Sequence, residues 1–557
     1  MNIDTFLAYH RLRQNPFTAE EARLDPVFSQ MHDDAVASST GDVGSDQRLQ
    51  SLPQHPDFSK IVGRIDQPST AVVFGEKGSG KTAIRLEMER LATELKRVGT
   101  KKVFTVPYDD LNPVLDLLMQ HRGLDAEGVL DRIRLEDHQD AILAAATTKL
   151  VDAVLEGRDD APLPEPRKRV SRHLSKEARR DLATLALLYD QPISGAPTER
   201  FHRLRRRLRL TGGVPLPAVL ATAVLLTLLA AVGLLGARAV PEDQALWWTV
   251  GGVASAIGAI ALWIWWFALK LRHWKLARQI AQQMPAVSRS RGELQQLLGD
   301  VSPRVLEGQP LPRGQIRDGD DSAGDARYRL TRKLLDVLAA FGYEGVMVLV
   351  DRIDEPSIVS GDADRMRRLV WPMFDNKFLK QDRVGLKLLL PLELSYLVQK
   401  ESSDFYQVAR LDKQALIERL EWTGSTLYDL CSTRLNAVHD PAMPAPTSRT
   451  TEPATVTDAS APTAQGVTAN DSSAGDGRLV LTDLFEPDVN REMLIDALDQ
   501  MRQPRDAFKF MYQVLQEHCT LVPEEAASFH IARLTLETVR KNQSQRVNEL
   551  YRGLGPA

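Results

Sequence analysis

The 557-residue chain contains only two cysteines, Cys431 and Cys519. Two thiols are too few for a disulfide framework or a Cys-ligand zinc site, although a single bridge is formally possible. The N-terminus also lacks the basic flank and apolar run of a secretory signal. Lys and Arg number 70 against 74 Asp and Glu, a net charge of −4, so whole-chain charge gives no reason to expect nucleic-acid binding. The folded parts are expected in a reducing compartment.

Charge is missing altogether from two long segments, 214–237 and 245–269. At 1.5 Å per residue, helices over these segments would cross a hydrocarbon core of about 30 Å. Only seven residues, 238–244, join them, so the pair is predicted to be a transmembrane hairpin. A buried hairpin of a soluble core is the alternative, and the absence of a polar stripe disfavours it.

Basic side chains flank the two spans on their outer sides. They are Arg200, Arg203, Arg205, Arg206, Arg207 and Arg209 before the first span and Lys270, Arg272, Lys275 and Arg278 after the second. This pattern predicts a multi-pass protein of the inner (plasma) membrane with both termini and the soluble core in the cytoplasm. A nucleic-acid patch is the competing interpretation of the arginine run, and its position beside a span favours topology and contact with anionic lipid.

Polar residues within the spans are few. They are Thr222, Thr227, Thr249 and Ser255, which favours an anchor over a pore or transporter. The second span also carries a face of small residues that could pack against its partner helix or another subunit: Gly251, Gly252, Ser255 and Gly258.

A short apolar strand candidate, 70–74, runs directly into a glycine-rich loop and then into a helical pattern over 83–97. The residues predicted to contact nucleotide phosphates are Gly75, Glu76, Lys77, Gly78, Ser79, Gly80, Lys81 and Thr82. Glycines let backbone N–H groups curl around phosphate oxygens at a helix N-terminus, Lys81 reaches the β and γ phosphates, and Thr82 ligates Mg²⁺. The pattern predicts a P-loop that binds ATP and Mg²⁺.

A P-loop calls for a second apolar strand that ends in an acid, and 346–350 followed by Asp351 supplies it. Asp351 is expected to hold Mg²⁺ through water. Asp354 or Glu355 would then polarise the attacking water as general base, and the sequence leaves open which of them acts. A buried strand ending in a solvated acidic turn is the alternative for this segment taken alone.

Further candidates complete the expected site. Segments 103–106 and 385–390 are strand candidates, and Glu393 follows the second of them where a polar residue could sense the γ-phosphate. Rapid hydrolysis calls for an arginine that neutralises charge in the transition state. Arg410 and Arg505 are the candidates, each with an ordinary surface or helix-cap arginine as its alternative.

The predicted fold class is α/β, with a parallel P-loop NTPase sheet interrupted by a helical insertion that carries the hairpin. The predicted organisation is an N-terminal segment 1–68, the first part of the core 69–112, a helical insertion 113–213, the hairpin 214–269, a post-membrane helical segment 270–325, the second part of the core 326–437, a flexible linker 438–478, and a helical C-terminal lid 479–557. The linker is rich in Ala, Pro, Thr, Ser, Asp and Gly and offers no apolar material for a core.

Together, the motif at 75–82, the membrane hairpin inserted before the strand at 346–351, and the helical C-terminal part resemble the KAP-type P-loop NTPases, membrane relatives of the AAA+ and STAND groups. The resemblance implies an ATPase face on the cytoplasmic side of the membrane, a helical lid, and a role in signalling or in defence against phage. Arg352 follows Asp351 where the family usually has a second acid. Residues 420–422, with Leu427 and Arg434 after them, are similar to the helix that follows the sheet in several of these ATPases, and an ordinary amphipathic helix with a core Trp422 is the alternative.

Three functions remain open at this stage. The first is Mg²⁺-dependent ATP hydrolysis that drives a conformational or assembly change in a homo-oligomer. The second is a slowly hydrolysing ATP switch or scaffold that recruits a partner effector, since no other catalytic motif occurs in the chain. The third is an ATP-gated, membrane-perturbing assembly, which needs oligomerisation because two apolar helices cannot line a polar channel alone. Tyrosine autokinases with two spans are excluded, because the seven residues between the spans cannot form their external domain.

Overall fold

The computed structural model describes residues 1–18, 21–31, 55–98, 102–155, 174–192, 195–213, 216–238, 241–312, 321–443, 478–523 and 528–551. Most of the predicted linker, residues 444–477, lies outside these ranges. The described residues form two compact units. The first comprises Met1–Lys60, Phe74–Leu91 and Glu418–Ala557, and the second comprises Ile61–Val73 and Ala92–Ile417.

A five-stranded parallel sheet organises the second unit, with strand order β2-β3-β4-β1-β5. The strands are β1 (Ala71–Gly75), β2 (Val103–Tyr108), β3 (Gly345–Val350), β4 (Val384–Pro391) and β5 (Ala415–Ile417). β1, β3 and β4 are buried along their whole length, as apolar strands covered on both faces should be. Their parallel direction puts the carboxyl ends at one edge of the sheet. The four strands expected from the sequence are confirmed, and only the three-residue β5 was not foreseen.

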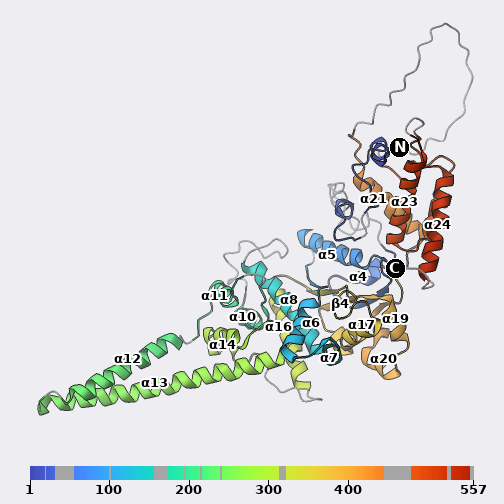
Figure 1. The fold of residues 1–557 in the computed structure, drawn as a ribbon. Helices are drawn as coiled ribbons and strands as arrows, with labels where there is room; N and C mark the ends of the chain where they lie inside the picture. Colours follow the sequence, from blue (N-terminus) through green and yellow to red (C-terminus); the bar gives the residue numbers. More distant parts are fainter. Residues whose placement is uncertain are drawn as a thin grey trace, which may run out of the picture. The chain divides into compact units, whose positions relative to one another are not determined.

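Helices of the second unit cover the sheet and connect its strands (Figure 1). Those between β2 and β3, apart from the hairpin, are α6 (Asn112–Arg122), α7 (Ala126–Arg132), α8 (Leu135–Leu155), α10 (Lys176–Tyr189), α11 (Pro197–Arg207), α14 (Arg291–Asp300), α15 (Pro303–Leu306) and α16 (Asp321–Ala340). Those after β3 are α17 (Ala363–Val370), α18 (Asn376–Leu379), α19 (Leu392–Gln399) and α20 (Ser403–Ala409). Side chains of α8 and α16 face β3 and β4 across a small, mostly apolar cavity.

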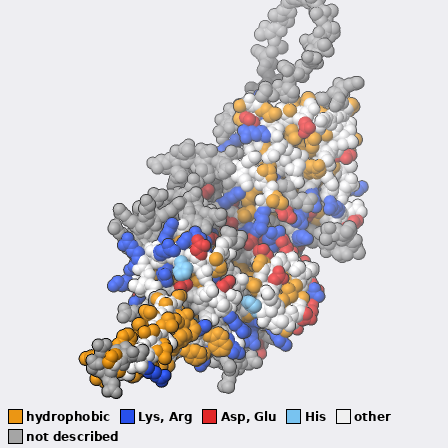
Figure 2. Space-filling model, turned by 60° about the vertical axis from the view of Figure 1, so that its left-hand side comes forward, with side chains coloured by type: hydrophobic (Ala, Val, Ile, Leu, Met, Phe, Trp, Pro, Cys, Tyr) orange, Lys and Arg blue, Asp and Glu red, His pale blue; other side chains and the backbone are white. Residues whose placement is uncertain are grey.

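The two apolar segments form a helical hairpin, α12 (Leu216–Gly236) and α13 (Glu242–Gln283), which extends away from the other helices of this unit (Figure 1). Both helices are long and apolar enough to cross a membrane, and only 22% and 11% of their most apolar windows are buried. Figure 2 shows hydrophobic side chains over the hairpin. Low burial argues against a hairpin hidden in a soluble core. α13 also runs 14 residues beyond the predicted span, from 270 to 283, as one continuous helix.

The hairpin helices meet at glycines. A Cβ built on Gly233 would lie 2.7 Å from the Cα of Gly252, closer than real Cβ contacts allow. The indole of Trp263 donates to the Thr227 hydroxyl at 3.2 Å farther along the same pair. Gly252 therefore packs against the partner helix as expected, whereas Gly251 of the predicted small-residue face has open space around it.

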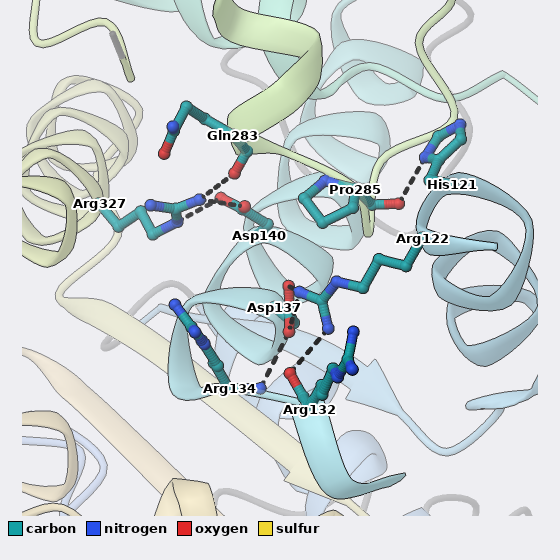
Figure 3. Close-up of polar contacts among 9 residues, drawn as sticks. All are labelled: His121, Arg122, Arg132, Arg134, Asp137, Asp140, Gln283, Pro285 and Arg327. Carbon is teal, nitrogen blue, oxygen red and sulfur yellow. Dashed lines mark hydrogen bonds and ion pairs between the residues drawn. The ribbon is translucent and has the colours of Figure 1, made fainter. Parts of the chain in front are cut away.

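Buried polar contacts hold the end of α13 to the body of the second unit (Figure 3). Arg327 of α16 donates to both carboxylate oxygens of Asp140 on α8, at 3.0 and 2.7 Å, and to the carbonyl of Gln283 at 2.5 Å. The Tyr189 hydroxyl donates to Asp140 at 2.9 Å. Beside them, a ring nitrogen of His121 hydrogen-bonds the Pro285 carbonyl at 2.8 Å. The last residue of α13 is thus tied directly to α16 through Arg327, which Asp140 of α8 holds in place, and the chain just after the helix is tied to α6 through His121.

The start of α12 is held in a different way. Gly212 forms an antiparallel bridge with Val301, and the Gly213 amide donates to the Asp300 carbonyl at 2.9 Å. A Cβ at Gly213 would stand 2.2 Å from the carbonyl oxygen of Gly299. Only glycine permits this close approach, so the chain before the hairpin is pinned to the end of α14.

The first unit is helical around an apolar core of its own. Its helices are α1 (Ile3–Tyr9), the first part of α5 (Lys81–Val98), α21 (Gly424–Val438), α22 (Arg491–Asp499), α23 (Pro504–Leu521) and α24 (Arg533–Tyr551), and α4 (Phe58–Val62) crosses the unit boundary. The buried Arg434 pairs with Asp25 at 2.5 Å and joins the N-terminal segment to α21. Pro504 is the first residue of α23.

Candidate functional site

The Gly75–Thr82 loop joins β1 to α5 and requires glycine at two positions. Gly78 and Gly80 have φ angles of 99° and 90°, a region that side chains with a Cβ rarely adopt. The Gly80 carbonyl accepts the Ile84 amide at 2.9 Å, and the Ser79 amide bonds back to the Glu76 carbonyl at 3.2 Å. The loop therefore curls tightly into the N-terminus of α5, where backbone N–H groups attract anions.

Lys81 and Thr82 are the first two residues of α5. The Lys81 ammonium donates to the carbonyls of Gly75 and Glu76 at 2.6 and 2.8 Å, which folds its side chain over the loop. Thr82 is half-buried on the first turn. The N-terminus of α5, the lysine and the hydroxyl thus lie together in the first unit.

The carboxylate of Glu76 is engaged on both of its oxygens. Arg419 contacts one at 2.7 Å, and the amide of Gln503 donates to the other. The Arg419 side chain is 39% exposed, and that of Glu76 is 20% exposed. The loop's acid is therefore neutralised by a residue just beyond β5 and bonded to the residue that precedes α23.

Trp422 lies against the loop from the chain that precedes α21. Its indole N–H donates to the Ser79 carbonyl at 2.8 Å, and its ring lies 3.6 Å from a Cβ position at Gly80. The helix expected after the sheet is α21, which contains Leu427 and Arg434 and begins at Gly424 with Thr423 as its cap, so residues 420–422 precede it. Trp422 contacts the glycine-rich loop as well as the core of the unit.

Arg505, a predicted catalytic arginine, lies in the first turn of α23 beside the loop. Its Cβ and Cδ are 3.1 and 3.2 Å from a Cβ position at Gly78. Its Nε is buried and, among the described residues, has no hydrogen-bond partner. Burial raises the pKa of the adjacent Asp506 carboxyl, and the cations Lys509, Arg546 and Arg505 oppose that rise. The structure brings Arg505 to the loop.

Asp351 comes directly after β3 and is 1% exposed. Its amide lies 3.4 Å from the Tyr108 carbonyl at the end of β2. Arg352 turns the chain with a φ of 60°, and its guanidinium pairs with Glu355 at 2.6 Å. Asp354 is half-buried between them. The three predicted acids therefore share one turn, with Asp351 buried and Glu355 held by Arg352.

A buried polar chain supports the end of β2 next to Asp351. The Tyr108 hydroxyl lies 2.9 Å from Nδ1 of His138, and Nε2 of His138 lies 2.9 Å from the Leu369 carbonyl. Burial lowers the pKa of His138 and raises that of Tyr108, so both stay neutral at pH 7. These contacts fix the strand ends against α8 and α17.

The two other predicted residues lie elsewhere in the second unit. Glu393 is exposed in the first turn of α19. Arg410 caps α20 with a φ of 47°, and its guanidinium pairs with Asp412 at 3.3 Å. The local contact of Arg410 matches the ordinary helix-cap alternative.

Sequence reasoning missed Arg419, Gln503 and the loop contact of Trp422. Among the described residues, no group of three or more His, Cys, Asp or Glu side chains is arranged to hold a metal ion. The assignment of Thr82 and Asp351 to Mg²⁺ comes from the sequence and stays a prediction. No family model matches the chain, and comparison with curated proteins and with solved structures finds no significant match.

Proposed function

We propose that this chain is a membrane-anchored P-loop ATPase that binds and hydrolyses MgATP on the cytoplasmic side. The observation that carries the proposal is the loop between β1 and α5, in which two glycines with positive φ precede Lys81 and Thr82 at a helix N-terminus. Open parallel sheets bind ligands beyond the carboxyl ends of their strands, and Asp351 ends a strand parallel to β1.

In this proposal the loop amides and Lys81 bind the phosphates, while Thr82 and Asp351 hold Mg²⁺. The ion would neutralise phosphate charge when bound. Asp354 is favoured over Glu355 as the residue that orients water, because Arg352 already pairs with Glu355. Arg505 is favoured over Arg410 as the arginine that meets the phosphates, because it lies against the loop whereas Arg410 pairs with Asp412.

ATP turnover by the detergent-solubilised full chain tests the proposal. Lys81→Ala should abolish binding and turnover, whereas Lys400→Ala, an exposed lysine at the end of α19, should change neither. Turnover that survives Lys81→Ala would refute the site. The assembly state with and without ATP, recorded in the same preparations, tests the expected homo-oligomer.

The second candidate is a slow ATP switch that recruits a partner effector. It is favoured by the contacts of Trp422, Gln503 and Arg505, which link the C-terminal helices to the loop and so make their position sensitive to nucleotide. Asp354→Asn should trap bound ATP if hydrolysis is fast, and should change little if the protein is a switch. If the protein is a switch, it should bind ATP tightly without turnover, and the ATP-bound protein should then capture the effector in a pull-down.

The hairpin is proposed to cross the membrane with its short connection on the outer side. Pro241→Cys should react with a membrane-impermeant maleimide in intact cells, and Gln279→Cys only after lysis. The two native cysteines are buried and give a low background.

Leakage from vesicles on addition of ATP would favour the membrane-perturbing alternative over an anchor. The resemblance to KAP-type NTPases supports a role in signalling or phage defence, and phage plating with wild type and Lys81→Ala tests that role.

A further inference from the structure

Arg419 stands beside the glycine-rich loop because the chain after β5 continues along β1. The Leu420 amide donates to the Phe74 carbonyl at 2.8 Å, and the Cβ of Leu420 lies 3.2 Å from a Cβ position at Gly75. This backbone contact fixes residue 419 next to the first residues of the loop. The position of Arg419 therefore follows from strand pairing rather than from a flexible surface contact.

Two cations converge on Glu76 from different sides. Lys81 donates to its backbone carbonyl at 2.8 Å, and Arg419 contacts its carboxylate at 2.7 Å. A carboxylate in a loop that takes a polyphosphate opposes binding by charge repulsion unless a cation neutralises it. Arg419 also lies 3.4 Å from Glu421, but this contact is longer than the one to Glu76 and exposed at both ends.

We infer that Arg419 is a phosphate-binding residue for the nucleotide, and that Glu76 holds its guanidinium in place until the phosphates take it over. The inference rests on the proposed function. A guanidinium binds phosphate through two parallel hydrogen bonds, and a polyphosphate with several charges competes for it with the single carboxylate of Glu76, whose side chain is 20% exposed. Glu76 keeps its bond to Gln503 after the exchange, so the C-terminal helices stay linked to the loop.

A double-mutant cycle in the full, solubilised chain separates this role from simple neutralisation of Glu76. Binding of ATP, ADP and AMP is measured directly at fixed Mg²⁺ by displacement of a fluorescent ATP analogue. If Arg419 binds phosphate, Arg419→Gln should weaken ATP binding about tenfold or more in the wild-type and in the Glu76→Gln background alike. The loss should be larger for ATP than for AMP. Glu76→Gln alone should tighten ATP binding, because it removes a negative charge and releases Arg419.

If Arg419 only neutralises Glu76, Arg419→Gln should have no effect once Glu76→Gln is present, and that result would overturn the inference. Arg419→Lys keeps the charge without the paired hydrogen bonds, so an intermediate loss supports phosphate contact even if Arg419→Gln folds poorly. Glu421→Gln is the matched control and should change binding less than twofold, since its contact with Arg419 is longer and exposed. ATP binding that is insensitive to Lys81→Ala would instead refute the proposed function itself, whatever Arg419 does.

Discussion

Replacing Arg327 by Met should release the end of α13 from the body of the second unit. Arg327 and Asp140 are 1% and 0% exposed, and the closest N–O distance between them is 2.7 Å. Removing one partner of a buried ion pair costs about 3 to 5 kcal/mol, because the other charge is left without compensation. The same substitution removes the donor to the Gln283 carbonyl at the last residue of α13.

Hydrogen exchange on the full chain in detergent measures this loss locally. A loss of 3 to 5 kcal/mol corresponds to exchange of protected α8 and α16 amides that is roughly 160- to 5,000-fold faster. Arg533→Met is the control, because its pair with Glu537 is exposed at both ends and should contribute less than about 0.5 kcal/mol. Protection should fall in the helices around Asp140 and stay unchanged in the first unit.

The pH dependence of stability gives a second test of the ion pair between Asp140 and Arg327. Burial raises the pKa of Asp140, and Arg327 opposes the rise. In Arg327→Met the carboxyl should protonate more readily in the folded chain than in the unfolded one, so the loss of stability should shrink as the pH falls. The double variant Asp140→Asn, Arg327→Met should recover much of the protection. Loss of protection below tenfold, or a double variant less stable than Arg327→Met, would refute the account of a buried ion pair.

Three further predictions concern single positions. Gly213→Ala should lower the free energy of unfolding by about 1 to 3 kcal/mol, because the added Cβ would clash with the Gly299 carbonyl oxygen. Gly292 has open space around it, so Gly292→Ala should be neutral or stabilising. Equal thermal midpoints of the two variants in detergent would contradict this prediction. Burial lowers the pKa of Lys387 to about 7, so above pH 7 the unfolded chain keeps a proton that the folded chain has lost. The free energy of unfolding should therefore rise with pH above 7, by up to about 1.4 kcal/mol per pH unit. Lys387→Met should abolish this slope in denaturation measured from pH 7 to 9. Burial lowers the pKa of His10 and His518 below 6.5, so the unfolded chain binds protons that the folded chain does not. Hydrogen exchange of α1, corrected for intrinsic rates, should therefore accelerate as the pH falls below 6.5. Protection of α1 that is independent of pH would contradict this prediction.

Features that depend on neighbours in the chain could be predicted from the sequence. Short apolar runs gave four of the five strands, and the two uncharged segments gave the hairpin helices. The 75–82 loop was predicted from the spacing of its glycines, Lys81 and Thr82 between a strand and a helix, and Gly78 and Gly80 adopt positive φ angles that favour glycine. β5 was missed because three residues carry too little pattern.

Contacts between residues far apart in the chain were beyond prediction. Glu76 and Arg419 are separated by 343 residues, and so are Ser79 and Trp422, while Asp140 and Arg327 are separated by 187. Nothing in the local sequence marks Arg419 as different from other surface arginines, or Arg327 as buried. Arg410 and Arg505 looked equivalent, and only the folded chain separated a local cap from a residue against the loop.

The sequence by itself determined the strand, glycine-rich loop and helix, the apolar hairpin, and the acid that ends β3, because backbone preference and hydrophobic periodicity act over a few residues. Tertiary structure alone decided which charges meet. It placed Arg419 on Glu76, Trp422 on Ser79 and Arg327 on Asp140. The physical reason is that burial and ion pairing depend on strand order and helix packing, which bring together segments that chain connectivity leaves independent.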